Sequence, residues 1–544
     1  MTNFENLLAE IDDFGIYQKL RYLMICLAAL LPSIVTYMHS FIAPKLNNSY
    51  RCKHPYVEND LFSLAHNFSS NITELGSCGY KIGDELVECN EWVYDRTFYQ
   101  QTLTEEWSMV CSDSGMIGTV QTIYFFGYLI GSIVMGIMAD HFGRRPIMLS
   151  SFIMIIVGSV GVAFGPQESF GRTISYTIYA ISRFIIACGT RGINVTGFVL
   201  GMEMMGPSRR TFAGIVIEYF FAIGQLILIS VVYLNYMILE NSWRFLAIGL
   251  IFIGFPFLSY FFILPESPRW LLSKNRKEEA LEILKHVAKT NKRQLKQETW
   301  ENLLMHHEHS ITNKVHEETA IDAIKSPKLV LMSCILFLNW IINNFLFYGL
   351  GLKSSELGVN PYVTFTISAL VEILAYLVTH VLLDRLGRKA PYVFFLFAAG
   401  ISCLSISFIS NNLIVVTLAM VGKFCASAAY AIIYLYTSEL FPTSIRNTGM
   451  GACSMMARVG AMTAPKILDL SSVSPNLPFV VFGISGIICS ASSVILPETL
   501  RRGLAENIKE ANSLNKLGLS CKATLDEDAD ELEMDSLNKK ENSF

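Results

Sequence analysis

Long apolar runs separated by polar segments dominate the chain. A membrane-spanning helix needs ~20 mostly apolar residues, and runs of about that length recur through most of the sequence. They predict twelve spanning helices near residues 20–42, 115–139, 146–165, 176–201, 211–235, 243–264, 328–351, 361–383, 391–410, 413–437, 447–468 and 477–497. We therefore expect an all-α membrane protein.

Three polar patterns return in the second half of the chain at similar offsets. Each pairs a segment before the long polar linker with one after it. The pairs are Asp140-His-Phe-Gly143-Arg144-Arg145 with Asp384-Arg-Leu-Gly387-Arg388-Lys389, Glu203 and Arg210 with Glu439 and Arg446, and Pro265-Glu266-Ser-Pro-Arg269 with Pro497-Glu498-Thr-Leu-Arg501. Many secondary transporters are duplicated bundles, so we expect two pseudo-symmetric six-helix halves at 20–264 and 328–497.

Composition and charge placement give the topology. Hydrophobic residues make up 52% of the 544 residues and charged ones 16%, and the mean hydropathy of +0.41 is that of a polytopic membrane protein. The N-terminal segment 1–19 is amphipathic and lacks the basic start and cleavage site of a signal peptide. If the N-terminus is cytosolic and successive spans cross in opposite directions, the loops that are rich in Lys and Arg lie on the cytosolic side. We expect a plasma-membrane protein with both termini cytoplasmic.

The polar loop 43–114 carries the signs of an extracellular cap. Four cysteines (Cys52, Cys78, Cys89 and Cys111) and three glycosylation sequons (at Asn47, Asn67 and Asn71) lie in it. Four cysteines allow three pairings, of which we favour Cys52 with Cys89 and Cys78 with Cys111. The linker 265–327 alternates charges at helical spacing and predicts short cytoplasmic amphipathic helices. Residues 498–544 form an acidic tail.

The repeated loops and several longer motifs narrow the family. The Asp-x-x-Gly-Arg loops resemble those of the major facilitator superfamily. Within it the chain resembles the organic cation, anion and carnitine transporters (solute carrier family 22), and the match lies in Trp92-Val-Tyr-Asp95, Glu106-Trp-Ser-Met-Val-Cys111, Pro265-Glu-Ser-Pro-Arg-Trp-Leu271 and Ser438-Glu-Leu-Phe-Pro-Thr-Ser-Ile-Arg-Asn447. The resemblance implies two halves that rock about a central substrate site.

The repeated charges are candidates for a cytoplasmic gate. An aspartate there can accept hydrogen bonds from a neighbouring arginine or from helix N-terminal amides, and Glu203 with Arg209 or Arg210, like Glu439 with Arg446, can join adjacent spans. The alternative is that the charges only anchor the topology. The predicted gating residues are Asp140, Arg144, Glu203, Arg210, Glu266, Arg269, Asp384, Arg388, Glu439, Arg446 and Glu498.

Four of the ionisable residues inside the predicted spans stand out. A charge at the bilayer centre costs about 2.5–3.5 kcal/mol on insertion scales, so each is a candidate for the substrate site. Glu372 would attract an ammonium group, unless it pairs with a neighbouring helix, and Arg458 would hold a carboxylate, unless it pairs with Glu218 or Glu372. Arg191 and Glu218 are further candidates. Lys423 has no clear role beyond neutralising an acid.

Aromatic side chains would complete the cavity. Trp340, Phe347, Tyr348 and Tyr434 lie in spans that resemble substrate-lining ones, and aromatic faces attract amines by ~0.5–2 kcal/mol each. By resemblance, Leu370-Val-Glu372 is typical of the cation and carnitine branches, whereas a basic residue at Arg458 is typical of the anion and carnitine branches. An acid and a base in one cavity fit a zwitterion.

No pattern in the sequence points to an enzyme. It contains no Walker A loop, no His-Glu-x-x-His and no Gly-x-Ser-x-Gly, and His306-His-Glu-His309 is interpreted as part of a solvated linker. We predict a secondary transporter of small organic cations or carnitine-like zwitterions, with no cofactor, no metal and no nucleic-acid partner. Coupling to Na+ or H+ and the oligomeric state are left open. The alternatives are an organic anion exchanger and a non-transporting receptor or scaffold.

Overall fold

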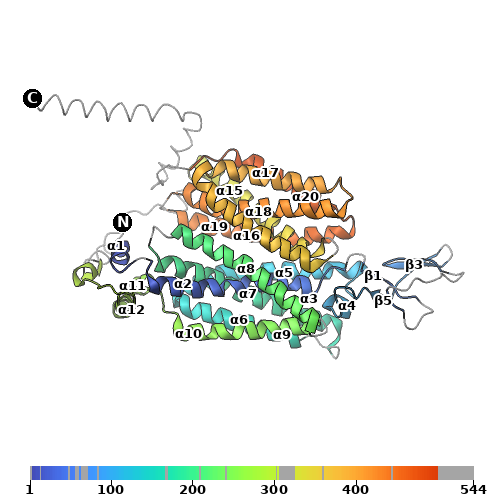
Figure 1. The fold of residues 1–544 in the computed structure, drawn as a ribbon, viewed down its shortest axis with the longest axis horizontal. Helices are drawn as coiled ribbons and strands as arrows, with labels where there is room; N and C mark the ends of the chain where they lie inside the picture. Colours follow the sequence, from blue (N-terminus) through green and yellow to red (C-terminus); the bar gives the residue numbers. More distant parts are fainter. Residues whose placement is uncertain are drawn as a thin grey trace, which may run out of the picture.

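The protein is a bundle of long helices with a small β-rich segment at one end (Figure 1). The computed structural model describes residues 3–499 apart from 13, 47–48, 55–59, 63–71, 83–84, 166–169, 207–209, 239–241, 302, 305–324, 358–359 and 443–444. We call the end with the β-rich segment the loop end. The opposite end, where the N-terminal helix and the linker helices lie, is the linker end.

Helices occupy every predicted spanning range. Before and within the linker they are α1 (Asn3–Glu10), α2 (Ile16–Ala28), α3 (Leu30–Ile42), α4 (Leu103–Glu106), α5 (Gly115–Phe142), α6 (Arg144–Phe164), α7 (Gly171–Met204), α8 (Arg210–Ile238), α9 (Trp243–Gly254), α10 (Tyr260–Ile263), α11 (Pro268–Ser273) and α12 (Lys277–Thr290). After it come α15 (Pro327–Lys353), α16 (Pro361–Leu386), α17 (Lys389–Ile406), α18 (Asn412–Leu440), α19 (Arg446–Asp469) and α20 (Leu477–Ser493).

The helix α19 is less apolar than the other long helices. In the part of the chain that the structure describes, ten helical segments are long and apolar enough to cross a membrane, and α20 is a shorter apolar helix. The helix α19 is not among them, although it fills its predicted range. It carries Arg458 and packs close to α15, since a side chain at Gly460 would collide with the carbonyl of Ile341.

The helices form two layers, α2–α10 below and α15–α20 above in Figure 1. In the first set α7 packs against α5 and α6, and α3 packs against α8. In the second set α15 packs against α19, and α17 against α18 and α20. The main helix contacts between the sets join α5 to α19 and α8 to α16, so these four helices surround the space between the layers.

Two disulfides hold the loop-end segment together. Strands β1 (Tyr50–Cys52) and β5 (Trp92–Tyr94) pair antiparallel, and β2 (Ile72–Leu75), β3 (Gly79–Ile82) and β4 (Glu85–Glu88) form an antiparallel sheet in that order. Cys52 is bonded to Cys89 and Cys78 to Cys111, each with its Cα atoms 5.6 Å apart. This is the pairing favoured from the sequence. Asn47, Asn67 and Asn71 lie outside the described residues.

A glutamate of the loop motif fastens this segment to the bundle. Both carboxylate oxygens of Glu106 accept hydrogen bonds from the guanidinium of Arg244, each at 2.7 Å, and Oε2 also accepts one from the indole of Trp243 at 2.9 Å. Arg244 and Trp243 begin α9. The motif residue therefore ties the loop to the bundle.

The linker helices form a second, smaller apolar core with the N-terminal segment. The amphipathic helices predicted for the linker are confirmed as α11 and α12. Leu7 and Ile11 of the N-terminal segment are buried against Trp270 and Leu284. Asn291 completes the contact, because its amide donates to the carbonyl of Ile11 at 2.9 Å and its oxygen accepts from the amide of Tyr17 at 3.0 Å. Residues 306–309 and the acidic tail from 500 lie outside the described part.

Candidate functional site

A cavity of about 940 Å³ lies between the two helix layers. Its walls come from α5, α7 and α8 on one side and from α15, α16, α18 and α19 on the other. At the linker end it reaches Arg388, Glu439, Arg446 and Glu498. The cavity is therefore continuous from the middle of the bundle to the repeated charges.

Six of the predicted substrate-binding residues line this cavity and two do not. The side chains at its wall include Arg191, Glu218, Phe347, Tyr348, Tyr434 and Arg458. Glu372 and Trp340 are missing from the wall and are completely buried. The structure corrects the expectation of direct substrate contact for these two. For the other six, contact with substrate stays a prediction.

Arg458 is buried at the cavity wall without a carboxylate partner. The side chain is only 1% exposed, and no ion pair joins it to Glu218 or Glu372, the partners considered from the sequence, or to another side chain of the described residues. Its guanidinium carbon lies 5.3 Å from the ring centre of Tyr128, and its Nε has no hydrogen-bond partner there. A buried positive charge of this kind favours an anionic ligand.

Arg191 approaches the same tyrosine from α7. Its guanidinium carbon lies 5.8 Å from the Tyr128 ring centre, and it donates hydrogen bonds to the hydroxyls of Ser132 at 2.7 Å and Ser454 at 3.3 Å. The bond to Ser454 joins α7 to α19 and so crosses between the helix sets. No described carboxylate forms an ion pair with Arg191.

Glu218 is an acid of the cavity wall. It lies on α8, is partly exposed and interacts electrostatically with both Arg191 and Arg458 without a close ion pair to either in the described structure. It lies about two turns from the end of α8 that begins at Arg210. Depth along the helix matters less here, since the cavity itself opens toward that end.

Glu372 forms an ion pair with Lys423, which is the alternative considered from the sequence. Its Oε2 lies 2.8 Å from the Lys423 ammonium, and the two side chains are 0% and 1% exposed. Its Oε1 accepts hydrogen bonds from the Gln225 amide and the Tyr376 hydroxyl, both at 3.1 Å. The ion pair joins α16 to α18, and Gln225 reaches it from α8.

The aromatic wall is one connected cluster. Phe347 stacks on Tyr430 with ring centres 4.5 Å apart, and the hydroxyls of Tyr430 and Tyr434 lie 3.1 Å from each other. Trp340 packs behind the wall, where its ring meets Tyr434 at 4.5 Å and its indole donates to Thr437 at 3.0 Å. Trp340 therefore positions Tyr434 instead of facing the cavity.

Sequence reasoning missed Tyr128, which stands between the two arginines. Its hydroxyl accepts a hydrogen bond from the Asn194 amide at 3.0 Å. A signal was present, because Gly127 and Gly131 flank it at the spacing that lets two membrane helices approach closely. A side chain at either glycine would collide with the backbone of α7.

At the linker end, Glu266 and Glu498 cap equivalent helices. The two carboxylate oxygens of Glu266 accept the backbone amides of Arg144 and Arg145, each at 3.1 Å. Those of Glu498 accept the amides of Arg388 and Lys389 at 3.0 and 3.1 Å. Acids at helix N-termini are stabilising there because amide donors and the helix dipole both favour negative charge.

The first arginine of each repeated loop contacts a glutamate of the repeat. Arg144 lies 3.0 Å from Asp140 and 3.3 Å from Glu203, and Arg388 lies 3.1 Å from Glu439. The pairing of Glu203 with Arg209 or Arg210, whose side chains lie outside the described part, and of Glu439 with Arg446 stays a prediction. Arg144 with Glu203 and Arg388 with Glu439 are the pairs that the structure shows. Both pairs join helices of one set, so in this conformation they strengthen each set and do not connect the two.

The other predicted gating residues have varied surroundings. The guanidinium of Arg269 lies 4.7 Å from the Phe4 ring centre, and Arg446 lines the cavity. The side chains of Arg210 and Asp384 lie outside the described part. The gating role itself stays a prediction.

The two helix sets meet tightly at the loop end. Lys45, just after α3, forms an ion pair of 2.5 Å with Asp469 at the end of α19. Tyr362 donates to the carbonyl of Phe98 at 2.5 Å and its ring contacts Phe41 and Tyr236. Contacts across the interface hold the two helix sets together at this end.

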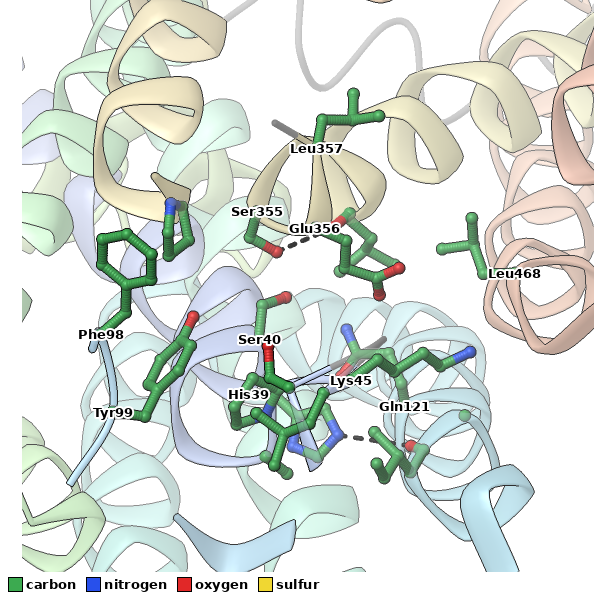
Figure 2. A pocket seen from close by; sticks show the side chains of 18 of the residues that line it. His39, Ser40, Lys45, Phe98, Tyr99, Gln121, Ser355, Glu356, Leu357 and Leu468 are labelled. Atoms are coloured by element: carbon green, nitrogen blue, oxygen red, sulfur yellow. Dashed lines mark hydrogen bonds between the residues drawn. The ribbon is translucent and has the colours of Figure 1, made fainter. Parts of the chain in front are cut away.

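A smaller pocket of about 430 Å³ remains at that junction. Figure 2 shows His39 and Lys45 on one side of it, and Ser355, Glu356 and Leu468 on the other. Lys45 pairs with Asp469, and Glu356 accepts from Lys353 at 2.7 Å. Both charges are thus satisfied within the protein, which distinguishes this pocket from the central cavity.

Comparison with known proteins identifies the family. A family model described as "Sugar (and other) transporter" matches residues 85–510. An organic cation transporter protein of Drosophila melanogaster is 32% identical, over 94% of this chain and 95% of its own length. The chain belongs to this transporter family. Solute carrier family 22 member 3 of Mus musculus is 32% identical over 79% of the chain and 75% of that protein, so the resemblance to family 22 is confirmed.

These relatives are transporters and not enzymes, but their names differ in substrate charge. Human organic anion transporter 3 is 33% identical over 77% of the chain and 75% of its own length. Among solved structures, an inward-open xylose transporter XylE from E. coli has a TM-score of 0.64 at 15% identity and covers 91% of this chain and 98% of that chain. This likeness shows a major facilitator fold. The protein is thus a multi-pass membrane transporter.

Proposed function

We propose that the protein is a secondary transporter of small organic ions that carry a carboxylate, with carnitine-like zwitterions as its leading substrates. One observation carries the proposal: Arg458, Arg191 and Glu218 line the same cavity, and none of them has a close ion-pair partner among the described residues. A membrane-buried charge without a partner is costly. A ligand with both charges offsets that cost.

The two ends of such a ligand have separate partners. A guanidinium binds a carboxylate through two parallel hydrogen bonds, which assigns the carboxylate to Arg458 and Arg191. The ammonium group lies toward Glu218 and the aromatic wall of the cavity, where an open aromatic face contributes ~0.5–2 kcal/mol. Glu372 takes no part in binding because Lys423 already neutralises it.

An organic anion exchanger is the second candidate. Arg191 and Arg458 give the cavity wall two positive charges, and Glu218 gives it one negative charge. Because Lys423 cancels the charge of Glu372, positive charge exceeds negative charge there. A substrate with an anionic group alone fits this balance if Glu218 serves only to offset one arginine.

Transport would proceed by alternating access of two six-helix halves, 20–264 and 328–497. Contacts across the loop end, such as Lys45 with Asp469, and a cavity that reaches the linker end support a conformation open at the linker end. The concentration of Lys and Arg at that end supports a cytosolic location for it. The disulfide-bonded loop would then lie on the extracellular side of a plasma membrane. Transport would be driven by the substrate gradient, by the membrane potential, or by coupled Na+ or H+.

Three compounds of the same shape test the substrate class. γ-Butyrobetaine has both charges, its methyl ester has only the ammonium, and 5,5-dimethylhexanoate, its carbon isostere, has only the carboxylate. Uptake of each is measured in oocytes that express the full chain, with and without Na+ and at two external pH values. We expect γ-butyrobetaine to be taken up fastest.

Glu218→Gln separates the two candidates. For a zwitterion carrier it lowers uptake of γ-butyrobetaine about tenfold or more and leaves uptake of the isostere unchanged or higher. Glu282→Gln, at an exposed glutamate of α12, is the matched control. Equal uptake of the isostere and the zwitterion, independent of Glu218, would favour the anion exchanger. No uptake of any compound by a protein at the cell surface would overturn the proposal in favour of a receptor or scaffold.

A further inference from the structure

The Glu372–Lys423 ion pair lies immediately behind the aromatic wall of the cavity. Lys423 Nζ is 3.8 Å from the ring centre of Phe347, and the Tyr376 hydroxyl donates to Glu372 Oε1 at 3.1 Å. Phe347 and Tyr376 both line the cavity. Only one layer of side chains therefore separates the ion pair from a bound ligand.

Across one layer of side chains, the charge of Glu372 or of Lys423 acts on a bound ligand only if the other charge of the ion pair is absent. Two opposite charges 2.8 Å apart have a field that falls steeply with distance, whereas a single unscreened charge acts over many ångströms in a medium of low dielectric constant. Glu372 without Lys423 would add one negative charge beside a cavity that is lined by two arginines and Glu218. Lys423 without Glu372 would add one positive charge.

We propose that Lys423 sets the charge selectivity of the transporter by neutralising Glu372. This inference rests on the proposed function, since it concerns which organic ions the same cavity accepts. Lys423 does not touch the substrate and is a positioning residue that acts through Glu372. The pair keeps the arginines as the dominant charges of the cavity and so excludes cations that have no carboxylate.

The surrounding contacts hold the Glu372–Lys423 ion pair in place. The Gln225 amide donates to Glu372 Oε1 from α8, across the boundary between the helix sets, and Lys423 Nζ donates to the Phe347 carbonyl at 3.4 Å. The carboxylate thus presents Oε2 to the ammonium while Oε1 is occupied. No other acid forms an ion pair with Lys423 in the described structure, so its loss leaves Glu372 as an uncompensated charge.

The test is the ratio of uptake of the methyl ester of γ-butyrobetaine to uptake of 5,5-dimethylhexanoate, with each rate normalised to protein at the cell surface. We expect Lys423→Met to raise this cation-to-anion ratio about tenfold or more, and Glu372→Gln to lower it. Lys423→Arg preserves the charge and keeps the ratio near that of the wild type. Lys274→Met, at an exposed lysine after α11, is the matched control for loss of a lysine.

Removing one partner of a buried ion pair can prevent folding, so a double variant gives a second test. Lys423→Met with Glu372→Gln leaves no charge at the site, and its ratio stays within about twofold of the wild-type value. A tenfold change in the double variant would overturn the proposal, as would an unchanged ratio in Lys423→Met at normal surface level. Failure of the wild type to transport any of the three compounds would instead refute the proposed function.

Discussion

Replacement of Gly387 by alanine should destabilise the linker end of the protein. Gly387 separates α16 from α17 with φ +85° and ψ −171°, a conformation that costs an L-residue about 1–3 kcal/mol. A Cβ atom there would also lie 2.7 Å from Glu498 Oε2. It would push the carboxylate away from the amides of Arg388 and Lys389, and hydrogen bonds to a charged group contribute about 1.5–3 kcal/mol each.

These two effects share one site and do not add fully. We therefore expect Gly387→Ala to lower the free energy of unfolding by about 3–5 kcal/mol. The assay is the apparent Tm in detergent, followed by the fraction of protein that stays monodisperse after heating. Gly451→Ala on α19 is the matched control, because its Cβ meets no atom within 4 Å. A glycine-to-alanine change inside a helix raises the free energy of unfolding by about 0.5–1 kcal/mol. A Gly387→Ala protein as stable as wild type would refute the reasoning.

Three further predictions concern other parts of the molecule. Lys45→Ala removes the ion pair with Asp469 and should increase labelling of a cysteine introduced at Ser40 by a membrane-impermeant maleimide; unchanged labelling would show that the pair does not help close the loop end. Non-reducing peptide mapping should recover a peptide that joins Cys78 to Cys111, and reduction should lower loop stability by about 2–4 kcal/mol, measured by resistance to protease; recovery of another pairing would contradict the structure. Asn291→Ala removes the bridge to the N-terminal segment and should speed amide hydrogen exchange in α1; an unchanged rate would show that the apolar contacts suffice.

The apolar runs predicted the helices well because a membrane imposes a length and a composition on each span. The repeat likewise predicted that Glu266 and Glu498 would have equivalent roles. Their role as helix caps depends on local backbone geometry, which the repeated glycine before each helix makes accessible. Local sequence was therefore sufficient wherever the interaction involved residues close to one another along the chain or a pattern that recurs in the sequence.

Partners on separate helices could not be predicted in the same way. Whether Glu372 faces the cavity depends on the rotation of α16 relative to α18, and the sequence contains both Glu372 and Lys423 without saying that they meet. The same holds for Arg144 and Glu203, which come together through the packing of α6 on α7. A periodic pattern shows that a residue lies in a span but not which neighbour it will contact.

The most direct test of the account is the preference of Arg458→Gln between two compounds that differ only in the carboxylate. Uptake of γ-butyrobetaine and of its methyl ester is measured at equal surface levels of wild type and variant. The account predicts that the ratio of zwitterion to ester falls at least tenfold, because the carboxylate loses its two-pronged partner while the ammonium keeps Glu218 and the aromatic wall. A ratio that stays at the wild-type value, with uptake still measurable, would contradict a carboxylate site at Arg458.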